Sequence, residues 1–484
     1  MYGGDEVSAV VMEIGSSSTK CGYAGEDTPK FVLPSAVGVM GGEASSTDKA
    51  KKQYFVGSNA MAVRRDGMRV ESPMTDGIVT DWDAAEALME HSYKSCLGAD
   101  AADHPLLMAE PSFNTASARE KTAELAFEKF GVPAFFLSKN AVLAAFAAGR
   151  GTALVLDVGG GTTCAAAVHD GYVLGSSLQK TPLAGDKINE LMLKALELRD
   201  PPPAIQPLYS LKRSSVGPGE FKTEVVDSPG THPSYRRYMQ LQVRGAAHPA
   251  HAARRPRAPP ARAHSPGRGT HTLTPARVPT LLPQVMREAK ECVGRCAFVP
   301  PSAAAPLDGS KWEYELPDRS VVDFGWERFH LPELFYQPAL LRSQPYVAPW
   351  LKSADPAGAL SPGAAELASL VPEGLTRGLP EMVADVIKAC DTDTRRELWG
   401  SVVVCGGGSL LPGLTERLHA RLNELVPQMS MKVKLIAPAT PSERRFAVWI
   451  GGSILASLGS FNQLWMSKAE YDEQGAAGIQ RKCP

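Results

Sequence analysis

The stretch LVLDVGGGTTC, Leu154–Cys164, decides how this chain folds. Its apolar run predicts a buried strand, and its three glycines predict a tight turn whose backbone amides no side chain covers. Amides exposed in this way form a small anion-binding concavity that suits a phosphate. Asp157 stands between the strand and the turn, where a carboxylate can hold a metal ion through water. A plain hairpin turn has the same pattern, so this stretch alone leaves both interpretations open.

Two more stretches repeat this pattern. Near the start, VVMEIGSSSTKCGY (residues 10–23) has an apolar strand, the acid Glu13, Gly15, small hydroxyl residues and then Lys20 on the returning strand. Later, SVVVCGGGSLLPGLTERL (residues 401–418) has a strand, a third glycine turn and an amphipathic helix. Two related hairpins and a third glycine turn predict a duplicated α/β fold with two domains that close on a nucleotide.

Length and composition exclude several classes of protein. The 484 residues exceed one ordinary domain and suit two large lobes with a shared cleft. The 51 lysines and arginines balance 52 acidic residues, so no global charge draws the chain to nucleic acid or a membrane. No basic start followed by an apolar core indicates secretion, and the longest apolar runs are too short to span a bilayer. The scattered cysteines predict reduced thiols of an intracellular protein.

The C-terminal run ERRFAVWIGGSILASLGSFNQLWMSKAEYDEQGAAGIQRKCP (residues 443–484) resembles the actin C-terminus along its whole length. The segments MYGGDEVSAVV, PAFFLSKNAVLAAFAAGR, VHDGYVL and KTPLAGD are similar to the nuclear class of actin-related proteins, which is found in chromatin-remodelling complexes. The chain is thus identified as resembling a member of the superfamily of actin, heat-shock chaperones and sugar kinases. The resemblance implies an α/β, actin-like duplicated two-lobe fold with a central nucleotide cleft.

The same resemblance implies a division into four subdomains. The first lobe core would comprise residues 1–36, 73–147 and 447–484, and a small divergent subdomain would comprise 37–72. The second lobe core would comprise 148–183 and 344–446, and an outer subdomain 184–343. The divergent loop Gly38 to Ala50 argues against a conventional filament contact.

Three segments carry local expectations. A helix is expected from Ala84 to Leu97 with Asp83 as its N-cap. The periodic pattern is lost from Pro201 onward, and the Pro- and Ala-rich segment Ser343 to Leu379 reads as a surface loop.

An insertion at residues 244–280 interrupts the outer subdomain. Ser228 to Arg287 contains no acidic residue and no lysine, and the segment has no hydrophobic period. It cannot bury enough apolar surface to offset its ordering entropy. Three interpretations stay open: a disordered basic insertion, a nucleic-acid-binding arm, or non-native sequence from a retained intron.

The resemblance also implies a nucleotide site for ATP and Mg²⁺. The phosphate-binding residues would be Ser16, Ser17, Ser18, Lys20, Gly159, Gly160, Gly161, Thr162, Thr163 and Gly185. The adenosine-binding residues would be Arg287, Lys290, Glu291, Gly406, Gly407, Gly408, Leu410 and Arg445. Glu13 and Asp157 would hold the metal through water, because Mg²⁺ keeps several waters and takes few protein oxygens. A fold that kept the turns and lost the ligand is the alternative.

Hydrolysis is not expected from this site. In-line attack on the γ-phosphate needs a positioned water held by polar side chains. Where actin has a glutamine and a histidine, this chain has Asn140, one methylene shorter, and Cys164, a weak hydrogen-bonding group. Gly160 also replaces an acid of the second phosphate loop. We therefore expect no catalytic residues, no enzyme, and ATP as a structural ligand that holds the lobes shut.

The resemblance then implies a function. It is that of a non-filamentous, nuclear subunit of chromatin-remodelling and histone acetyltransferase complexes, such as SWI/SNF. The partners would be actin or another actin-related protein and the helicase-SANT-associated helix of the remodeller ATPase, with indirect contact to chromatin and none to a membrane. The docking groove would be lined partly by Val448 to Met466. A cytoskeletal filament protein with ATPase activity is the alternative, and a small-molecule kinase lacks its carboxylate base here.

Overall fold

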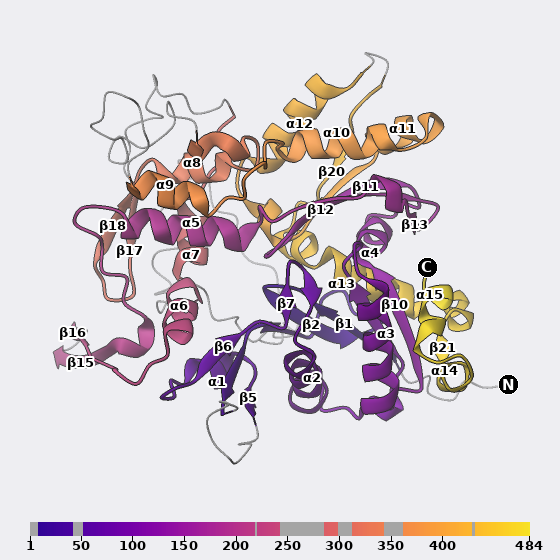
Figure 1. Ribbon diagram of the computed structural model, residues 1–484, viewed down its shortest axis with the longest axis horizontal. Coiled ribbons are helices and arrows are strands. Elements are labelled where there is room, and N and C mark those ends of the chain that lie inside the picture. Colours follow the sequence, from indigo (N-terminus) through magenta and orange to yellow (C-terminus); the bar gives the residue numbers. More distant parts are fainter. Residues whose placement is uncertain are drawn as a thin grey trace, which may run out of the picture.

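The computed structural model describes residues 8–41, 52–217, 220–242, 285–298, 312–342, 362–427 and 431–484. Two central mixed sheets organise these residues (Figure 1). The first has the strand order β21 (Met466–Ser467), β10 (Ala134–Lys139), β9 (Leu106–Glu110), β1 (Val10–Ile14), β2 (Ser18–Tyr23) and β3 (Phe31–Pro34). The second has the order β13 (Tyr172–Val173), β12 (Thr163–His169), β11 (Ala153–Val158), β19 (Val402–Cys405) and β20 (Leu435–Ile436), and β14 (Gln179–Thr181) also pairs with β12.

The two sheets repeat one topology. In each, an antiparallel hairpin (β1–β2 or β11–β12) is extended on one side by two parallel strands, β9 and β10 or β19 and β20. On the other side, the returning strand pairs antiparallel with β3 or with β13 and β14. The predicted duplicated α/β fold is therefore confirmed, and the glycine-rich turns lie at equivalent places in the two sheets.

Helices α4 (Asn140–Ala147) and α13 (Pro441–Ser457) lie between the sheets and contact both (Figure 1). Strand β11 faces two cores because its side chains alternate: Leu154 and Leu156 belong to the second lobe core, and Val155 packs in the core that contains α4 and α13. Its continuous apolar run follows from burial on both faces. Within the described ranges, no helix is long and apolar enough to cross a membrane.

The first sheet carries α2 (Trp82–His91), a π-helical turn from Ser92 to Leu97, and α3 (Ala116–Glu124), which a second π-helical turn extends to Lys129. The expected helix ends at Leu97, but its expected start is wrong. Helix α2 begins at Trp82, and the N-cap is Asp81, whose side chain accepts a hydrogen bond from Ala84 N at 3.0 Å. Asp83 lies inside the first turn instead.

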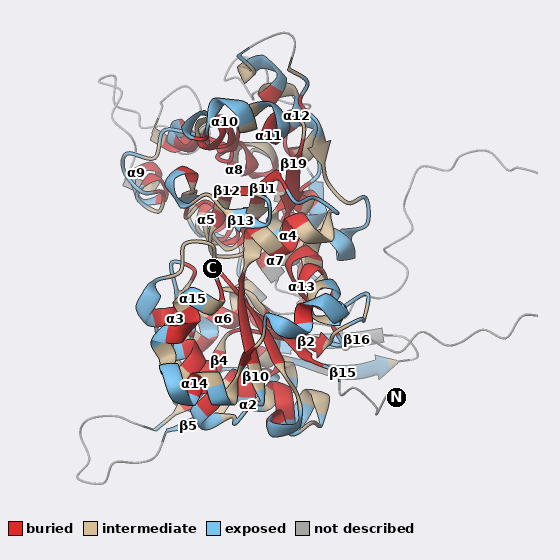
Figure 2. Cartoon of the chain, turned by 90° about the vertical axis from the view of Figure 1, so that its right-hand side faces the viewer, coloured by how far each residue is buried: buried red, intermediate tan, exposed pale blue. Residues whose placement is uncertain are grey.

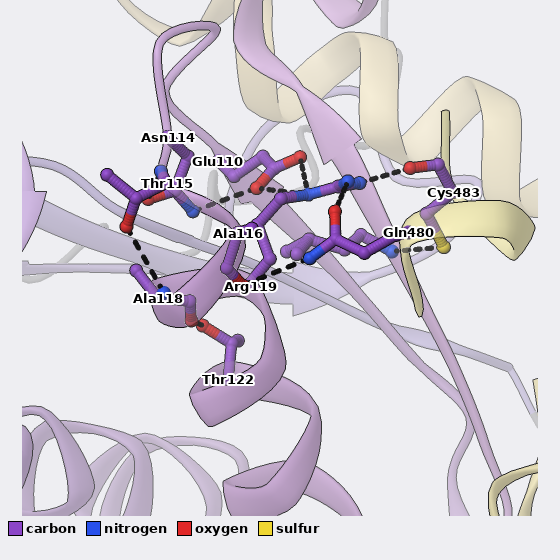
Figure 3. A network of polar contacts seen from close by, with 10 residues as sticks. Glu110, Asn114, Thr115, Ala116, Ala118, Arg119, Thr122, Gln480 and Cys483 are labelled. Atoms are coloured by element: carbon purple, nitrogen blue, oxygen red, sulfur yellow. Dashed lines mark hydrogen bonds and ion pairs between the residues drawn. The ribbon is translucent and has the colours of Figure 1, made fainter. Parts of the chain in front are cut away.

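The C-terminus returns to the first sheet. Helices α14 (Lys468–Gln474) and α15 (Ile479–Lys482) lie beside α3 (Figure 1). The buried Arg119 of α3 donates to both oxygens of Glu110 at 2.9 and 3.1 Å and to Gln480 Oε1 at 2.6 Å (Figure 3). It also donates to the carbonyl of Cys483, so one guanidinium connects strand β9 to the last residues of the chain.

Helices α10 (Leu379–Ala389) and α11 (Thr392–Trp399) contact the second sheet, and α12 (Leu414–Leu425) packs on α10. Helix α5 (Gly185–Glu197) packs on the helices that lie outside this sheet. Outside it lie α6 (Pro233–Gln242), α7 (Val285–Val293), α8 (Glu327–Glu333), α9 (Pro362–Ser369) and two hairpins, β15 (Leu211–Gly217) with β16 (Glu220–Val225) and β17 (Trp312–Glu315) with β18 (Val321–Phe324). Beside the first sheet lie α1 (Ser58–Ala62), the small sheet β5 (Gln53–Phe55), β4 (Val37–Met40) and β6 (Arg69–Glu71), and the hairpin β7 (Met74–Thr75) with β8 (Ile78–Val79). Figure 2 shows buried residues along the strands and the inner sides of the helices.

Two expectations about irregular segments are wrong. Regular secondary structure does return after Pro201. It forms the hairpin β15–β16 and helix α6, whose Tyr235, Tyr238 and Met239 are buried. Between Ser343 and Leu379 there is helix α9, which buries Leu367. The insertion at 244–280 and most of the loop at 38–50 lie outside the described residues, and the four-subdomain division stays a prediction.

Deleting residues 244–280 is expected to leave thermal stability and ATP binding unchanged. Helix α6 ends at Gln242 and α7 begins at Val285, and the two helices pack against each other. The deletion leaves both helices and their contact intact, and shortening a long connection changes the closure entropy little. The measurement is a thermal melt of the deleted chain with and without ATP. Loss of cooperative unfolding would show that the segment is part of the lobe.

Candidate functional site

The turns of the two hairpins have the same backbone geometry. Gly15 N–H donates to Ser18 O at 3.1 Å, and Gly159 N–H donates to Thr162 O at 3.0 Å. Each turn encloses two residues whose amides, among the described residues, donate to no protein acceptor. Such amides are available to an anion, as the sequence pattern predicts.

The two turns face each other across the space between the lobes. A Cβ on Gly160 would lie 2.5 Å from Ser17 Cβ, and a Cβ on Gly161 would lie 2.7 Å from Ser16 Cβ. No real Cβ has neighbours this close, so any side chain at either glycine would push the hairpins apart. The glycines therefore permit close approach of the two lobes as well as the turn itself.

The duplicated register places two carboxylates at equivalent positions. Glu13 pairs across its hairpin with Lys20, and Asp157 pairs across its hairpin with Cys164. The ammonium of Lys20 forms a buried ion pair with Glu13. In the second hairpin the neutral Cys164 takes the place of the lysine, so two acids share one cation.

The excess of negative charge affects the pKa of Asp157. Burial and, after it, the nearby Glu13 raise the pKa of Asp157 to about 6, although Lys20 acts in the opposite direction. The Oε2 atom of Glu13 is buried without a hydrogen-bond partner. Excess negative charge and an unpartnered carboxylate oxygen are both relieved by a bound cation, so these residues fit a hydrated Mg²⁺.

A third wall comes from the glycine turn after β19 and from α7. Gly406 has φ +86° and packs so closely on Asp157 and Val158 that a Cβ would overlap both. Glu291 of α7 forms an ion pair with Arg445 of α13 at 3.4 Å. Lys290 donates to Gly185 O at 3.0 Å, and burial lowers the pKa of Lys290 to about 8.

Arg287 lies one helical turn before Lys290 on α7 and reaches the first hairpin. It donates a hydrogen bond to Ser17 Oγ and lies 3.7 Å from a carboxylate oxygen of Asp186. Ser17 belongs to the first hairpin, whereas Arg287 and Asp186 belong to helices of the second lobe. The guanidinium therefore joins the two sides of the cleft at the turns.

One cavity gathers the predicted residues. It is lined by all the residues expected for phosphate, adenosine, metal and hydrolysis except Thr163 and Leu410. Thr163 is buried and donates to Leu183 O at 2.6 Å. The cavity is also lined by residues that sequence reasoning did not single out, among them Met74, Gly77, Ser112, Phe113 and Asp186. Ser112 and Phe113 follow the carboxyl end of β9. Ligands bind at this edge of such sheets, so their position in the sequence could have predicted them as site residues.

The two positions expected to fail in hydrolysis both line this cavity. Asn140 begins α4, and its Oδ1 atom is buried without a hydrogen-bond partner. Burial and the neighbouring Asp157 raise the pKa of Cys164 to about 12, so this thiol stays neutral. A neutral thiol neither accepts a proton from water nor orients it well.

Cation binding at this site should weaken in acid. Because burial raises the pKa of Asp157 to about 6 from an ordinary 3.8, a proton competes with the metal below pH 6. One competing proton predicts about tenfold weaker Mg²⁺ binding at pH 5 than at pH 7. The same shift means that Asp157 destabilises the metal-free fold as pH rises through 6. Calorimetric titration of Mg²⁺ tests this, and the Asp157→Asn variant should lose the pH dependence that belongs to this carboxylate.

Comparison with known proteins agrees with the fold. A family model described as Actin matches residues 4–484. An Actin-related protein 4 from Arabidopsis thaliana is 41% identical over 505 residues, with 100% of both chains covered. Proteins of the same name from Oryza sativa subsp. japonica and Emericella nidulans are 40% and 34% identical, covering 100% of this chain and 100% and 98% of theirs. The chain therefore belongs to the actin family, as an actin-related protein.

Proposed function

We propose that this chain is an ATP-binding, non-filamentous subunit of nuclear chromatin-remodelling and histone acetyltransferase complexes. One observation carries the nucleotide half of the proposal: the amides of two opposed glycine-rich turns, Lys20 and an excess of carboxylate charge line a single cavity. Amides and an ammonium suit phosphate oxygens, and the carboxylates suit Mg²⁺. The nucleotide would hold the lobes together, since its phosphates would lie between turns of both.

The nuclear half of the proposal rests on the segments that resemble the nuclear class and on one surface. Ile454, Leu458 and Leu464, near the C-terminal end of α13, keep 39%, 39% and 48% of their surface exposed. They fall inside the stretch expected to line the docking groove. An apolar surface of this kind suits the apolar face of a helix, here that of a remodeller ATPase beside actin or another actin-related protein.

The experiment is purification of the tagged chain from nuclei, followed by mass spectrometry. Remodeller and acetyltransferase subunits should copurify, and Leu458→Asp should lose the ATPase subunit but keep ATP binding. Val63→Asp is a matched control, because Val63 is also exposed but lies in the small subdomain. Recovery of filament regulators, or pelleting of the purified chain in Mg²⁺ and salt, would favour the cytoskeletal alternative instead.

ATP turnover by the purified chain should be slow, and the double substitution Asn140→Gln with Cys164→His should raise it. A positioning or proton-transfer group contributes about 10²–10⁴ in rate, so the double variant should gain at least tenfold. Asp157→Ala added to the double variant is the control and should abolish the gain. Rapid turnover by the unaltered chain, lost on Asp157→Ala, would contradict this expectation.

A further inference from the structure

A pair of cysteines lies on the side of the first sheet that faces away from the cavity. Side chains alternate along β2, so Lys20 points into the cavity and Cys21 points into the opposite core. Cys21 is fully buried there, against the π-helical turn that contains Cys96. The Cys96 side chain is only partly buried, so one thiol of the pair can be reached from solvent.

The two thiols lie close together in one core, beside an imidazole. The Cys96 thiol interacts with the Cys21 thiol and with His91 of the preceding helix turn. His91 is fixed in place because it packs on Gly57, where a Cβ would lie 2.7 Å from the ring Nε2. Among the described residues, no group of three or more His, Cys, Asp or Glu side chains is arranged to hold a metal ion, so this group is a dithiol and not a metal site.

Cys96 is the thiol of this pair that favours the thiolate. The hydrogen bond from Cys21 lowers the pKa of Cys96 most, and His91 lowers it further, against the effect of burial. Hydrogen bonding and burial raise the pKa of Cys21, which therefore keeps its proton. A thiolate beside a protonated thiol is the arrangement of an attacking cysteine and a resolving cysteine.

The other cysteines differ from this pair. Cys164 and Cys405 both lie near the Asp157 carboxylate, which together with burial raises the pKa of each thiol. Burial also raises the pKa of Cys296 and Cys483. Cys292 is exposed as a residue, but its sulfur is partly buried. This burial and two nearby glutamates raise the pKa of its thiol.

We propose that Cys21 and Cys96 are an oxidation site that a hydroperoxide converts to a disulfide. The Cys96 thiolate attacks the peroxide O–O bond and becomes a sulfenic acid, releasing hydroxide or alkoxide. The Cys21 sulfur then attacks the Cys96 sulfur, the S–O bond breaks, and the proton of Cys21 leaves with the hydroxyl as water. The two cysteines lose two electrons and the peroxide gains them. The disulfide would join β2, the strand of Lys20, to the π-helical turn.

The test uses the full, reduced chain treated with hydrogen peroxide under native conditions. After alkylation of the remaining thiols, peptide mapping should find Cys21 linked to Cys96, with both thiols restored by a dithiol reductant. The free thiol of Cys96 should disappear at least tenfold faster than that of Cys292, because the thiolate and not the thiol reacts with peroxide. Oxidation of Cys292 first, or a Cys96 that accumulates sulfenic acid without linking, would overturn the proposal.

Two variants separate the roles of the two thiols. Cys21→Ala should leave Cys96 as a sulfenic acid that a carbon-acid probe traps, because no resolving thiol remains. Cys96→Ser should leave Cys21 unreactive while the native chain is folded. Cys292→Ser is the matched control and should form the same link at the same rate. A Cys21 that is oxidised in the Cys96→Ser variant would contradict the assignment of Cys96 as the attacking thiol.

Discussion

Replacing Arg119 with methionine is expected to lower the free energy of unfolding by about 3–5 kcal/mol, the usual effect of breaking a buried ion pair from one side. The side chain of Arg119 keeps 8% of its surface exposed, and that of Glu110 keeps 2%. Burial already raises the pKa of Glu110 even with the arginine in place. Without the arginine, the buried carboxylate of Glu110 keeps the hydrogen bond from Asn114 at 2.8 Å but loses its ion pair, so it must take up a proton or stay charged, and both destabilise the fold.

The effect should depend on pH. Loss of Arg119 raises the pKa of Glu110 further, so the variant binds a proton on folding at pH values where the unfolded chain does not. Its deficit relative to the parent chain should therefore shrink as pH falls from 7 to 5. Urea unfolding at the two pH values measures this. An equal deficit at both would mean that lost packing, not the unpaired carboxylate, is the cause.

The same substitution should free the C-terminus locally. Arg119 donates to the carbonyl of Cys483, and Leu137 N–H donates to Cys483 Sγ at 3.3 Å in the network of Figure 3. Burial raises the pKa of Cys483 to about 12, so this thiol should resist a thiol reagent in the parent chain and react in the variant. Lys121→Met is the matched control, because its ion pair with Glu124 on the same helix is exposed to solvent and contributes little to stability.

Sequence alone predicts the hairpins and glycine turns because backbone geometry demands them. A turn that approaches a second turn as closely as Gly160 approaches Ser17 accepts only glycine, and such positions are visible in a sequence. Register then follows from the hairpin, which places Glu13 opposite Lys20 and Asp157 opposite Cys164.

Short elements in Pro-rich surroundings were missed for a different reason. Helix α6 buries Tyr235, Tyr238 and Met239, which have helical spacing, but neighbouring prolines and arginines hide this pattern. The N-cap Asp81 lies two residues before the acid that was expected, and two acids so close in sequence differ only in which side chain turns back to the amide of Ala84.

No sequence pattern predicts the contacts between segments that are far apart in the chain. Arg287 is expected to bind the nucleotide, but its side chain also contacts Ser17 and Asp186 because of how α5 and α7 pack near the first hairpin. The contact of Cys21 with Cys96 likewise depends on a π-helical turn, whose extra residue no periodic pattern predicts.

Replacing Gly451 with alanine is expected to destabilise the chain by about 3 kcal/mol, although alanine is the better helix former. Gly451 lies where α13 crosses α4, and a Cβ there would overlap the carbonyl oxygen of Leu143. The clash is with backbone, so no rotamer change relieves it, and the two helices between the sheets must separate. Helix propensity would return about 1 kcal/mol, which is too little to reverse the sign.

Two other glycines provide the comparison for Gly451→Ala. At Gly452 a Cβ would lie 3.0 Å from Val11 Cγ1 and 3.1 Å from Leu107 Cδ2, so small side-chain shifts suffice and the loss should be smaller. Gly459, just beyond the end of α13, has open space around its Cβ position, and its alanine variant should be nearly neutral. Urea unfolding of the three variants should therefore rank 451, 452 and 459 in falling order of destabilisation. Stabilisation by Gly451→Ala would mean that α4 and α13 cross more loosely, and that the two sheets do not depend on backbone contact between these helices.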